Sequence, residues 1–376
     1  MPMLKLNEAD YKLKDESAML SPQLLYYRDI VERNILRMSE MAGGAEHLWP
    51  HIKTHKSAQL VKVLMSHGIR RFKAATIAEA EMAARCGAEH VILSYPLVGP
   101  NIPRFIRLIQ TFAGTSFYAI GDDPGQISCL SGCAVSAGLR VWFLVDVNDG
   151  LNRTGVPTPE AGKLFRFAAS LSGIEACGMH VYDGQRHEGD KAVRQELVDT
   201  DLISVHQLRD ELVQAGYNCD IMVMGGTPSF PCHAQYSGVF YSPGTCVLED
   251  YGYASSFPDL PFEIAAILLT RVISHPTRGY FTVDLGYKAV AADPAIPRAV
   301  IIGYEDAETV MQNEEHWVLR MPAGKEDRVP PVGQALYAVP VHICPTSALY
   351  PSVPVISNGE VIDEWEITAR NRKLSI

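Results

Sequence analysis

The sequence predicts a (β/α)8 TIM-type barrel followed by a mostly antiparallel β domain. From about residue 26 to residue 258, short apolar runs alternate with amphipathic segments, the pattern of βα units around a parallel sheet. After residue 259 the pattern changes to β-rich runs separated by turn residues. The 376 residues have room for both parts, because such barrels take about 250 residues. An open, doubly wound sheet is the structural alternative.

Three regions follow from this pattern. Residues 1–25 are expected to form an N-terminal segment that packs with the β domain, residues 26–258 the barrel, and residues 259–376 the β domain.

The composition favours a cytoplasmic protein that acts on or binds small molecules. The formal net charge of −10 would repel a phosphate backbone, which argues against nucleic-acid binding. The N-terminus lacks the apolar run of a signal peptide, and no run reaches the roughly 18 apolar residues that span a bilayer. Eight cysteines without a CxxC pair indicate reduced thiols.

The barrel elements are justified by period and caps. Apolar residues at helical spacing end at Gly43 and Gly44, and Thr76 is a typical N-cap. Helices are expected over about 26–44, 57–68, 76–87, 124–138, 158–173 and 191–216, and strands over 71–75, 90–95, 115–121, 140–147, 176–182, 220–226 and 238–242.

The second domain is predicted as strands between Gly, Pro, Asn and Asp turns. The expected strands are 265–275, 279–286, 298–304, 316–321, 335–343, 353–357 and 360–368.

The first chemical candidate is "WPHIKTHKSAQL", residues 49–60, which places His51, Lys53, His55 and Lys56 within six residues. Strand alternation would direct His51, Lys53 and His55 to one side, the lumen at a strand's C-terminal end. An imine-forming amine must be partly deprotonated, and desolvation with nearby cations favours this. Lys53 is therefore a candidate imine former.

Two late loops are candidates for holding a phosphate. "VMGGTPSF" (223–230) and "YSPGTCVLED" (241–250) combine glycines, which allow close backbone approach, with threonine hydroxyls and N–H groups. Barrel enzymes often bind phosphate after their last two strands. The residues concerned are Gly225, Gly226, Thr227, Gly244 and Thr245.

Three further groups could carry chemistry. Arg153 follows a strand end and could clamp a phenolate or carboxylate, and "GMHVYDGQRHEGD" supplies His180, Tyr182 and His187. His342 and Cys344, at i and i+2 on an expected strand, would offer nitrogen and sulfur to a metal such as Zn²⁺.

These features, in this order, resemble the D-threonine aldolase and D-serine dehydratase family of fold-type III pyridoxal-phosphate (PLP) enzymes. The most specific matches are "PHIKTHK" and "HICPT", supported by "NRTG", "GGTPS" and "SPGT", and the resemblance covers nearly the whole chain. It implies an alanine-racemase-like barrel, PLP, a divalent metal (Zn, Mn or Mg) and a homodimer.

The resemblance also assigns roles. Lys53 would hold PLP as a Schiff base and Lys56 would support it by charge, while Arg153 would contact the phenolic oxygen and Tyr182 the ring. A histidine is expected near Gln185 in many relatives, so His187 becomes the candidate base for the β-hydroxyl. The two late loops would bind the cofactor phosphate, and His342 and Cys344 would bind the metal.

Several activities fit this site. Cleavage of a β-hydroxy-D-amino acid to glycine and an aldehyde is favoured, because the chain most resembles the bacterial-type D-threonine aldolase branch. A D-serine or 3-hydroxy-D-aspartate dehydratase, giving a 2-oxo acid and ammonia, is the alternative. A racemase is disfavoured because it has no obvious need for a metal, and a non-catalytic PLP carrier because such carriers resemble the barrel alone.

Overall fold

The structure is a computed structural model that describes residues 6–373 and 375–376. The chain divides into two compact units. The β unit contains the described residues up to Arg37, Thr54–Leu60 and Thr245–Arg370. The barrel unit contains Met38–Lys53, Val61–Gly244 and the described residues from Asn371 onward.

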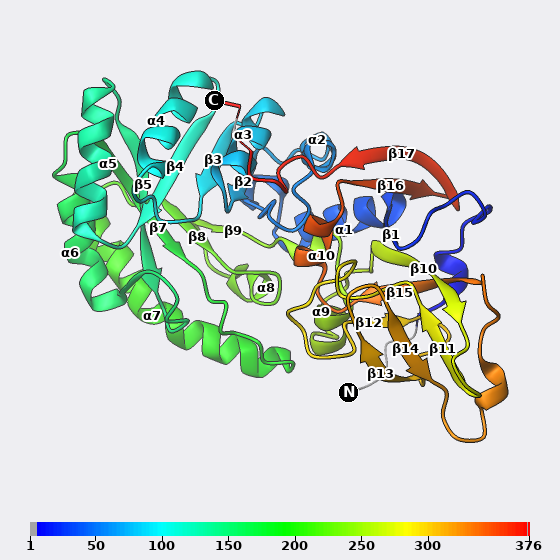
Figure 1. Ribbon diagram of the computed structural model, residues 1–376. Coiled ribbons are helices and arrows are strands. Elements are labelled where there is room, and N and C mark those ends of the chain that lie inside the picture. The colour runs from blue at the N-terminus through cyan, green and yellow to red at the C-terminus, as the bar shows by residue number, and fades with distance from the viewer. Residues whose placement is uncertain (1–5, 374) are drawn as a thin grey trace. The chain divides into compact units, whose positions relative to one another are not determined.

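The barrel unit is built on a parallel sheet (Figure 1). Segment 48–51 closes this sheet, because Leu48 pairs with Tyr241 at one edge and His51 pairs with Lys73 at the other. The closure confirms the predicted barrel over the open sheet. In spatial order the strands are β2 (Arg71–Ala74), β3 (His90–Leu93), β4 (Ser116–Gly121), β5 (Val141–Asn148), β7 (Ile174–Val181), β8 (Ile221–Met224) and β9 (Val239–Tyr241), with β6 (Val156–Pro157) beside β5.

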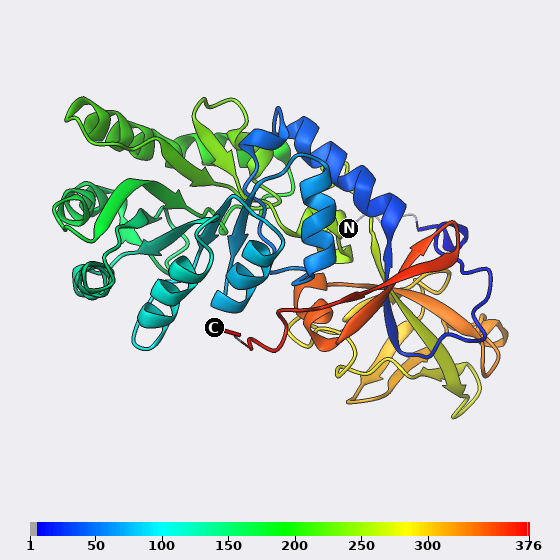
Figure 2. The ribbon, with the colours of Figure 1, turned by 90° about the horizontal axis from the view of Figure 1, so that it is seen from above.

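Helices α3 to α7 lie outside these strands (Figure 2). Thr76 caps α3 by accepting from Glu79 N (3.1 Å), as its position predicts. Helix α4 was not expected from the sequence, although its buried apolar residues recur at helical spacing. The helices are α1 (Arg28–Met41), α2 (Ala58–Ser66), α3 (Ile77–Arg85), α4 (Asn101–Thr111), α5 (Pro124–Ser136), α6 (Thr158–Ala169), α7 (Lys191–Gln214) and α8 (Phe230–His233).

Apolar side chains fill the lower barrel lumen. Trp49 is 1% exposed and packs edge-on against Tyr118, with ring centroids 5.3 Å apart. Ile92, Leu144 and Val223 belong to the same buried cluster. Because this apolar cluster fills one end of the lumen, the polar lumen residues lie toward the C-terminal strand ends, where barrel enzymes have their active sites.

The β unit contains a mostly antiparallel sheet, as predicted. Strand β1 is antiparallel to β10 and parallel to β16, so Tyr26 and Tyr27 lie in a strand and not in the expected helix. Both rings are buried, which the strand pairing permits. The strands are β1 (Gln23–Tyr27), β10 (Ala266–Ser274), β11 (Tyr280–Val283), β12 (Ala299–Ile301), β13 (Glu308–Gln312), β14 (Trp317–Arg320), β15 (Ala335–Pro340), β16 (Ser352–Ser357) and β17 (Glu360–Glu366).

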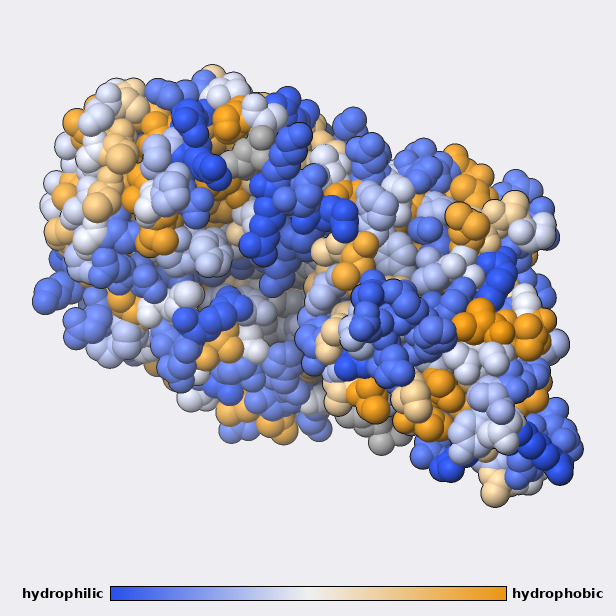
Figure 3. All heavy atoms as spheres, in the orientation of Figure 1, coloured by the Kyte–Doolittle hydropathy of each residue, from blue (hydrophilic) through white to orange (hydrophobic). Residues whose placement is uncertain are grey.

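The N-terminal segment contacts the sheet of the β unit. Leu13 N donates a hydrogen bond to Tyr337 Oη (2.8 Å), and Tyr11 Oη donates to Ile264 O (3.2 Å). Among the described residues, no helix combines the length and the hydropathy that crossing a membrane requires. The face drawn in Figure 3 shows hydrophobic residues among hydrophilic ones.

Candidate functional site

Lys53 lies in a turn immediately after the barrel-closing segment. The β-bridge at His51 is the last of this segment, and residues 52–55 form a turn, so the expected strand alternation does not extend to His55. Ile52 N donates to Lys73 O (2.9 Å), which anchors the turn to β2. Lys53 itself is half-buried. His55 is buried in the β unit, where desolvation and the Lys56 charge lower its pKa to about 3.

A second lysine, Lys73 on β2, lies inside the barrel. Its side chain is 3% exposed, and Nζ donates to Ser242 Oγ (2.9 Å), which in turn donates to Gly225 O (3.0 Å). Burial and then the Lys53 charge lower the pKa of Lys73 to about 7. The sequence signal for Lys73 is its position within the apolar strand "RFKAA", where a lysine is unusual. Sequence reasoning gives it no role.

Tyr182, the residue directly after β7, lies next to two cations. Arg153 Cζ is 4.9 Å from the Tyr182 ring centroid and Lys73 Nζ is 5.2 Å from it, distances at which cation–π attraction acts. Arg153 is exposed and Tyr182 half-buried. The structure therefore brings these two predicted residues together at the barrel mouth.

An aspartate–histidine pair occupies the lumen on the adjacent strands β5 and β7. His180 Nδ1 and Asp146 Oδ1 are 2.7 Å apart. Burial and the charge of Lys73 lower the pKa of His180. Burial alone would raise the pKa of Asp146, but the hydrogen bond and charge of His180 and a hydrogen bond with Thr154 lower it. His180 Nε2 is buried without a hydrogen-bond partner in the described structure.

The first glycine loop has the close-packed backbone that its sequence predicts. Gly225 has φ +72, and a Cβ there would lie 2.8 Å from Phe230 Cα. A Cβ on Gly226 would lie 3.2 Å from Tyr182 Cε2. Gly244 N donates to Thr227 Oγ1 (3.2 Å), which joins the two loops within the barrel unit.

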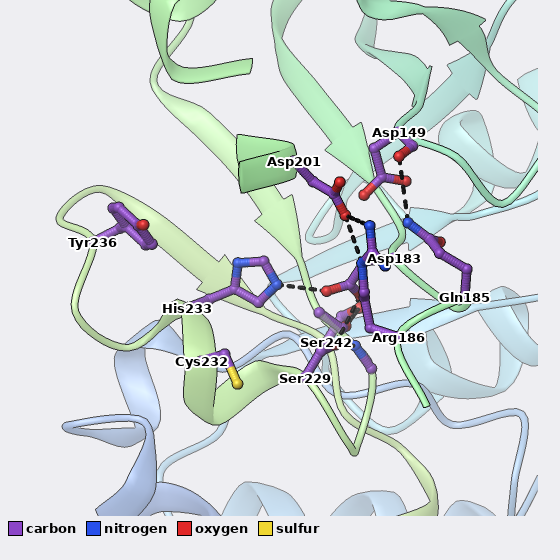
Figure 4. Close-up of polar contacts among 12 residues, drawn as sticks. Asp149, Asp183, Gln185, Arg186, Asp201, Ser229, Cys232, His233, Tyr236 and Ser242 are labelled. Atoms are coloured by element: carbon purple, nitrogen blue, oxygen red, sulfur yellow. Dashed lines mark hydrogen bonds and ion pairs between the residues drawn. The ribbon is translucent and has the colours of Figure 1, made fainter. Parts of the chain in front are cut away.

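A buried network supports the first loop (Figure 4). Asp183 accepts hydrogen bonds from Ser229 Oγ (2.8 Å) and His233 Nε2 (2.7 Å), and Gly226 N donates to Ser229 Oγ (3.0 Å). Asp183, Ser229 and His233 are each at most 3% exposed. The sequence did not single out this network, because its members are up to 50 residues apart.

His187 is exposed, in the segment between β7 and α7. Its neighbour Arg186 is fixed by Asp201, with Nε to Oδ2 at 2.6 Å. Gln185 Nε2 donates weakly to Asp149 O (3.4 Å). These contacts hold the segment that carries His187 against the barrel unit.

In the β unit, His342 and Cys344 lie at the start of helix α10 (Ile343–Leu349) and not on a strand as expected. Pro345 explains the difference, because it has no N–H for a strand ladder but is tolerated in a first helical turn. His342 Nδ1 donates to Asp293 Oδ2 (2.6 Å), and Thr54 Oγ1 is 3.1 Å from Cys344 Sγ.

Electrostatics distinguish this pair. Burial alone would lower the pKa of His342, but a hydrogen bond with Cys344, the Cys344 charge and Asp293 together raise it to about 9. Thr245 Oγ1 is 3.6 Å from Cys344 Sγ. The His342 imidazole and the Cys344 thiol are therefore in contact. The described residues contain no cluster of three or more His, Cys, Asp or Glu side chains that could hold a metal ion.

Two buried acids, Glu249 and Asp250, were not expected from the sequence. Each is 2% exposed, and burial raises the pKa of both carboxyl groups, that of Asp250 to about 6. Asp250 Oδ2 accepts from Ile343 N (3.0 Å), which holds the start of α10 in the β unit.

Comparisons with known proteins agree with this architecture. Residues 28–251 match the family model described as "Alanine racemase, N-terminal domain", and residues 265–356 match "Putative serine dehydratase domain". The chain is 28% identical to the 3-hydroxy-D-aspartate aldolase of Paracoccus denitrificans (strain Pd 1222), with 95% of this chain and 94% of that protein covered.

A second relative and a solved structure extend the similarity. The D-threonine aldolase of an Arthrobacter species is 29% identical, over 93% of this chain and 92% of its own. The crystal structure of D-threonine aldolase from Filomicrobium marinum superposes with a TM-score of 0.86 at 27% identity, covering 95% of this chain and 97% of that one.

Proposed function

Because the chain belongs to the family described as the alanine racemase N-terminal domain, we propose that it is a PLP- and divalent-metal-dependent lyase of β-hydroxy-D-amino acids. The favoured reaction is retro-aldol cleavage to glycine and an aldehyde. The observation that carries the proposal is the presence, in one chain, of a lysine at the barrel-closing segment and a histidine–cysteine pair at α10. Both curated relatives described above are named as aldolases.

The barrel residues fit PLP by their chemistry. When bound, PLP supplies an electron-accepting ring that labilises the bonds at the substrate Cα. Lys53 Nζ would hold the cofactor covalently. Gly225 and Gly226 lack the Cβ atoms that would fill their loop, and Thr227 would add a hydroxyl for a phosphate oxygen.

Arg153 and Tyr182 would orient the ring. The guanidinium of Arg153 can donate to a phenolate oxygen, and its position 4.9 Å from the Tyr182 ring centroid keeps both groups at one place on the barrel mouth.

His342 and Cys344 would hold the metal. A nitrogen and a sulfur ligand suit Zn²⁺ and similar borderline ions. Asp293 accepts from Nδ1 of His342 and so fixes the ring's orientation, as carboxylates do for metal-bound histidines. Two protein ligands leave coordination positions for water and the substrate hydroxyl.

His187 would remove the hydroxyl proton in the aldolase reaction. An imidazole is the side chain best suited to accept a proton near neutral pH, and His187 is exposed in the segment that follows β7. In this reaction no group has to remove a proton from Cα, because the bond that breaks joins Cα to Cβ. Cα would then have to gain a proton to become the CH2 group of glycine.

Dehydration is the second candidate. The match of residues 265–356 to a putative serine dehydratase domain favours it. Lys53 would then remove the α-proton, and the metal would assist departure of the hydroxyl as water, which leaves a 2-oxo acid and ammonia after hydrolysis. The same side chains serve both reactions.

Product analysis separates the two candidates. The purified protein, loaded with PLP and Mn²⁺ or Zn²⁺, is incubated with D-threonine, D-serine and 3-hydroxy-D-aspartate. Glycine with an aldehyde supports the aldolase, and a 2-oxo acid with ammonia supports the dehydratase. No product from any of these substrates would contradict the lyase proposal and favour a non-catalytic carrier.

The cofactor assignment has its own test. Lys53→Ala is expected to abolish the visible absorbance of the PLP-loaded protein, because no covalent attachment can form. Lys62→Ala, which changes an exposed lysine on α2, is the matched control and should retain the band. A band retained in Lys53→Ala would refute the assignment. Sedimentation analysis of the same samples tests the expected homodimer.

A further inference from the structure

Lys73 is placed where a lysine is costly. It lies on β2 with Phe72 and Ala74 as buried neighbours, and its own side chain is 3% exposed. The one side-chain hydrogen bond of Nζ in the described structure goes to the neutral hydroxyl of Ser242 (2.9 Å). Burying an ammonium without a carboxylate partner costs several kcal/mol, so an apolar residue would stabilise this strand better. Such a local conflict is typical of a functional position.

The charges around Lys73 are mixed and come from several elements. Lys53 and Arg153 oppose its protonation, whereas Asp146 and Asp183 favour it. His180 is also coupled to it, because the Lys73 charge lowers the pKa of His180. Beside these groups lies His180 Nε2, a buried polar atom without a hydrogen-bond partner in the described structure. The lumen therefore contains an unsatisfied imidazole nitrogen as well as a desolvated amine.

Lys73 is also connected to the candidate cofactor loop. Ser242 Oγ accepts a hydrogen bond from Lys73 Nζ and donates one to Gly225 O (3.0 Å), at the start of the first glycine loop. The Tyr182 ring, which Arg153 contacts from the mouth, lies 5.2 Å from Nζ. A ligand that reaches Tyr182 and the glycine loop thus comes within the range of the Lys73 charge.

We propose that Lys73 is a second functional lysine of the barrel, a binding residue whose ammonium attracts the anionic phosphopyridine cofactor and makes its binding depend on proton uptake. This inference rests on the proposed function. It assigns Lys53 to covalent attachment and Lys73 to non-covalent charge recognition. An ammonium that gains an anionic partner in a low-dielectric lumen recovers the penalty that it carries in the free protein.

The direction of the pH effect follows from linkage. In the free protein the pKa of Lys73 is lowered to about 7, first by desolvation and then by the Lys53 charge. A bound anion raises that pKa, so above about pH 7 binding takes up a proton and affinity falls as the pH rises. The ligand phosphate, with a second pKa of about 6, remains mostly dianionic in this window.

The probe is pyridoxine 5′-phosphate, which keeps the ring and phosphate but has no aldehyde to react with Lys53. Calorimetric titrations of the full chain between about pH 6.5 and about pH 8.5, in buffers of different ionisation enthalpy, give Kd and the number of protons taken up. The variants are Lys73→Met, which removes the charge, and Lys73→Arg, which keeps it at every pH. Lys163→Met, an exposed lysine on α6, is the control.

For the native protein and the control we expect Kd to rise with pH and proton uptake to accompany binding. Lys73→Met should bind roughly tenfold to a hundredfold more weakly at the acidic end, the usual worth of a charged hydrogen bond, and should lose the uptake. Lys73→Arg should bind without pH dependence, which also shows that the barrel tolerates substitution here.

Native-like affinity and pH dependence in Lys73→Met would overturn the role of Lys73 while leaving the Lys53 absorbance band, and hence the proposed function, intact. Absence of both binding and the band in the native protein would overturn both.

Discussion

The buried carboxylate of Asp183 gives the sharpest prediction on stability. Asp183→Ala removes the acceptor of Ser229 Oγ and of His233 Nε2, and both donors remain buried. A stranded buried donor costs about 1–3 kcal/mol, so the two together should lower the free energy of unfolding by about 2–6 kcal/mol. Because Ser229 also accepts from Gly226 N, the glycine loop should loosen and affinity for pyridoxine 5′-phosphate should fall.

Urea unfolding followed by tryptophan fluorescence measures this loss, since Trp49 is buried in the barrel core. Asp220→Asn, on an exposed side chain before β8, is the control and should change stability by no more than about 0.5 kcal/mol. A loss below about 1 kcal/mol in Asp183→Ala would show that the network is not a stabilising unit.

The pH dependence of this effect has a definite sign. Burial alone would raise the pKa of Asp183, but the charge of His233 and the hydrogen bonds from His233 and Ser229 lower it. The stabilisation is therefore complete above the unfolded-state pKa of about 3.9 and is lost as the pH falls through the lower folded-state value. The difference between the native protein and Asp183→Ala should narrow only in strong acid.

Three other outcomes are expected. Gly225→Ala should weaken binding of pyridoxine 5′-phosphate and lower stability, because φ is +72 and the new Cβ would lie 2.8 Å from Phe230 Cα; unchanged calorimetric and urea curves would contradict this. Burial raises the pKa of Asp149 to about 6, so the folded state loses stability as the pH rises from the unfolded-state pKa of about 3.9 to about 6, and Asp149→Asn should resist urea better above about pH 6 but not below about pH 4. Cys344→Ser should bind Zn²⁺ more weakly, as His342→Ala should, while Cys129→Ser, on an exposed cysteine, should bind it normally.

Much of the fold was predictable because the hydrophobic period and the caps of barrel strands and helices are signals in the local sequence. The strand "RVWFLVDV" and the capped helix after Thr76 appear where period and cap place them. Tyr26 and Tyr27 were misassigned because their strand pairs with residues more than 200 positions away, a partner that no local window contains. His342 and Cys344 were recognised as a pair, but a helix start and not a strand holds them.

The sequence by itself determined the parts whose signal is a residue type at a fixed local spacing: the Lys53 motif, the glycine loops, the histidine–cysteine pair and the alternating pattern of the barrel. Only the tertiary structure decided which other polar residues are buried and which partners they acquire. In the sequence Lys73 looks like any other lysine, but the closed barrel buries it beside Ser242. Asp183 likewise looks like an ordinary loop acid, but in the fold it accepts hydrogen bonds from Ser229 and His233. Burial and long-range hydrogen bonds arise from contacts between distant segments, and these contacts shift the pKa values of common polar residues.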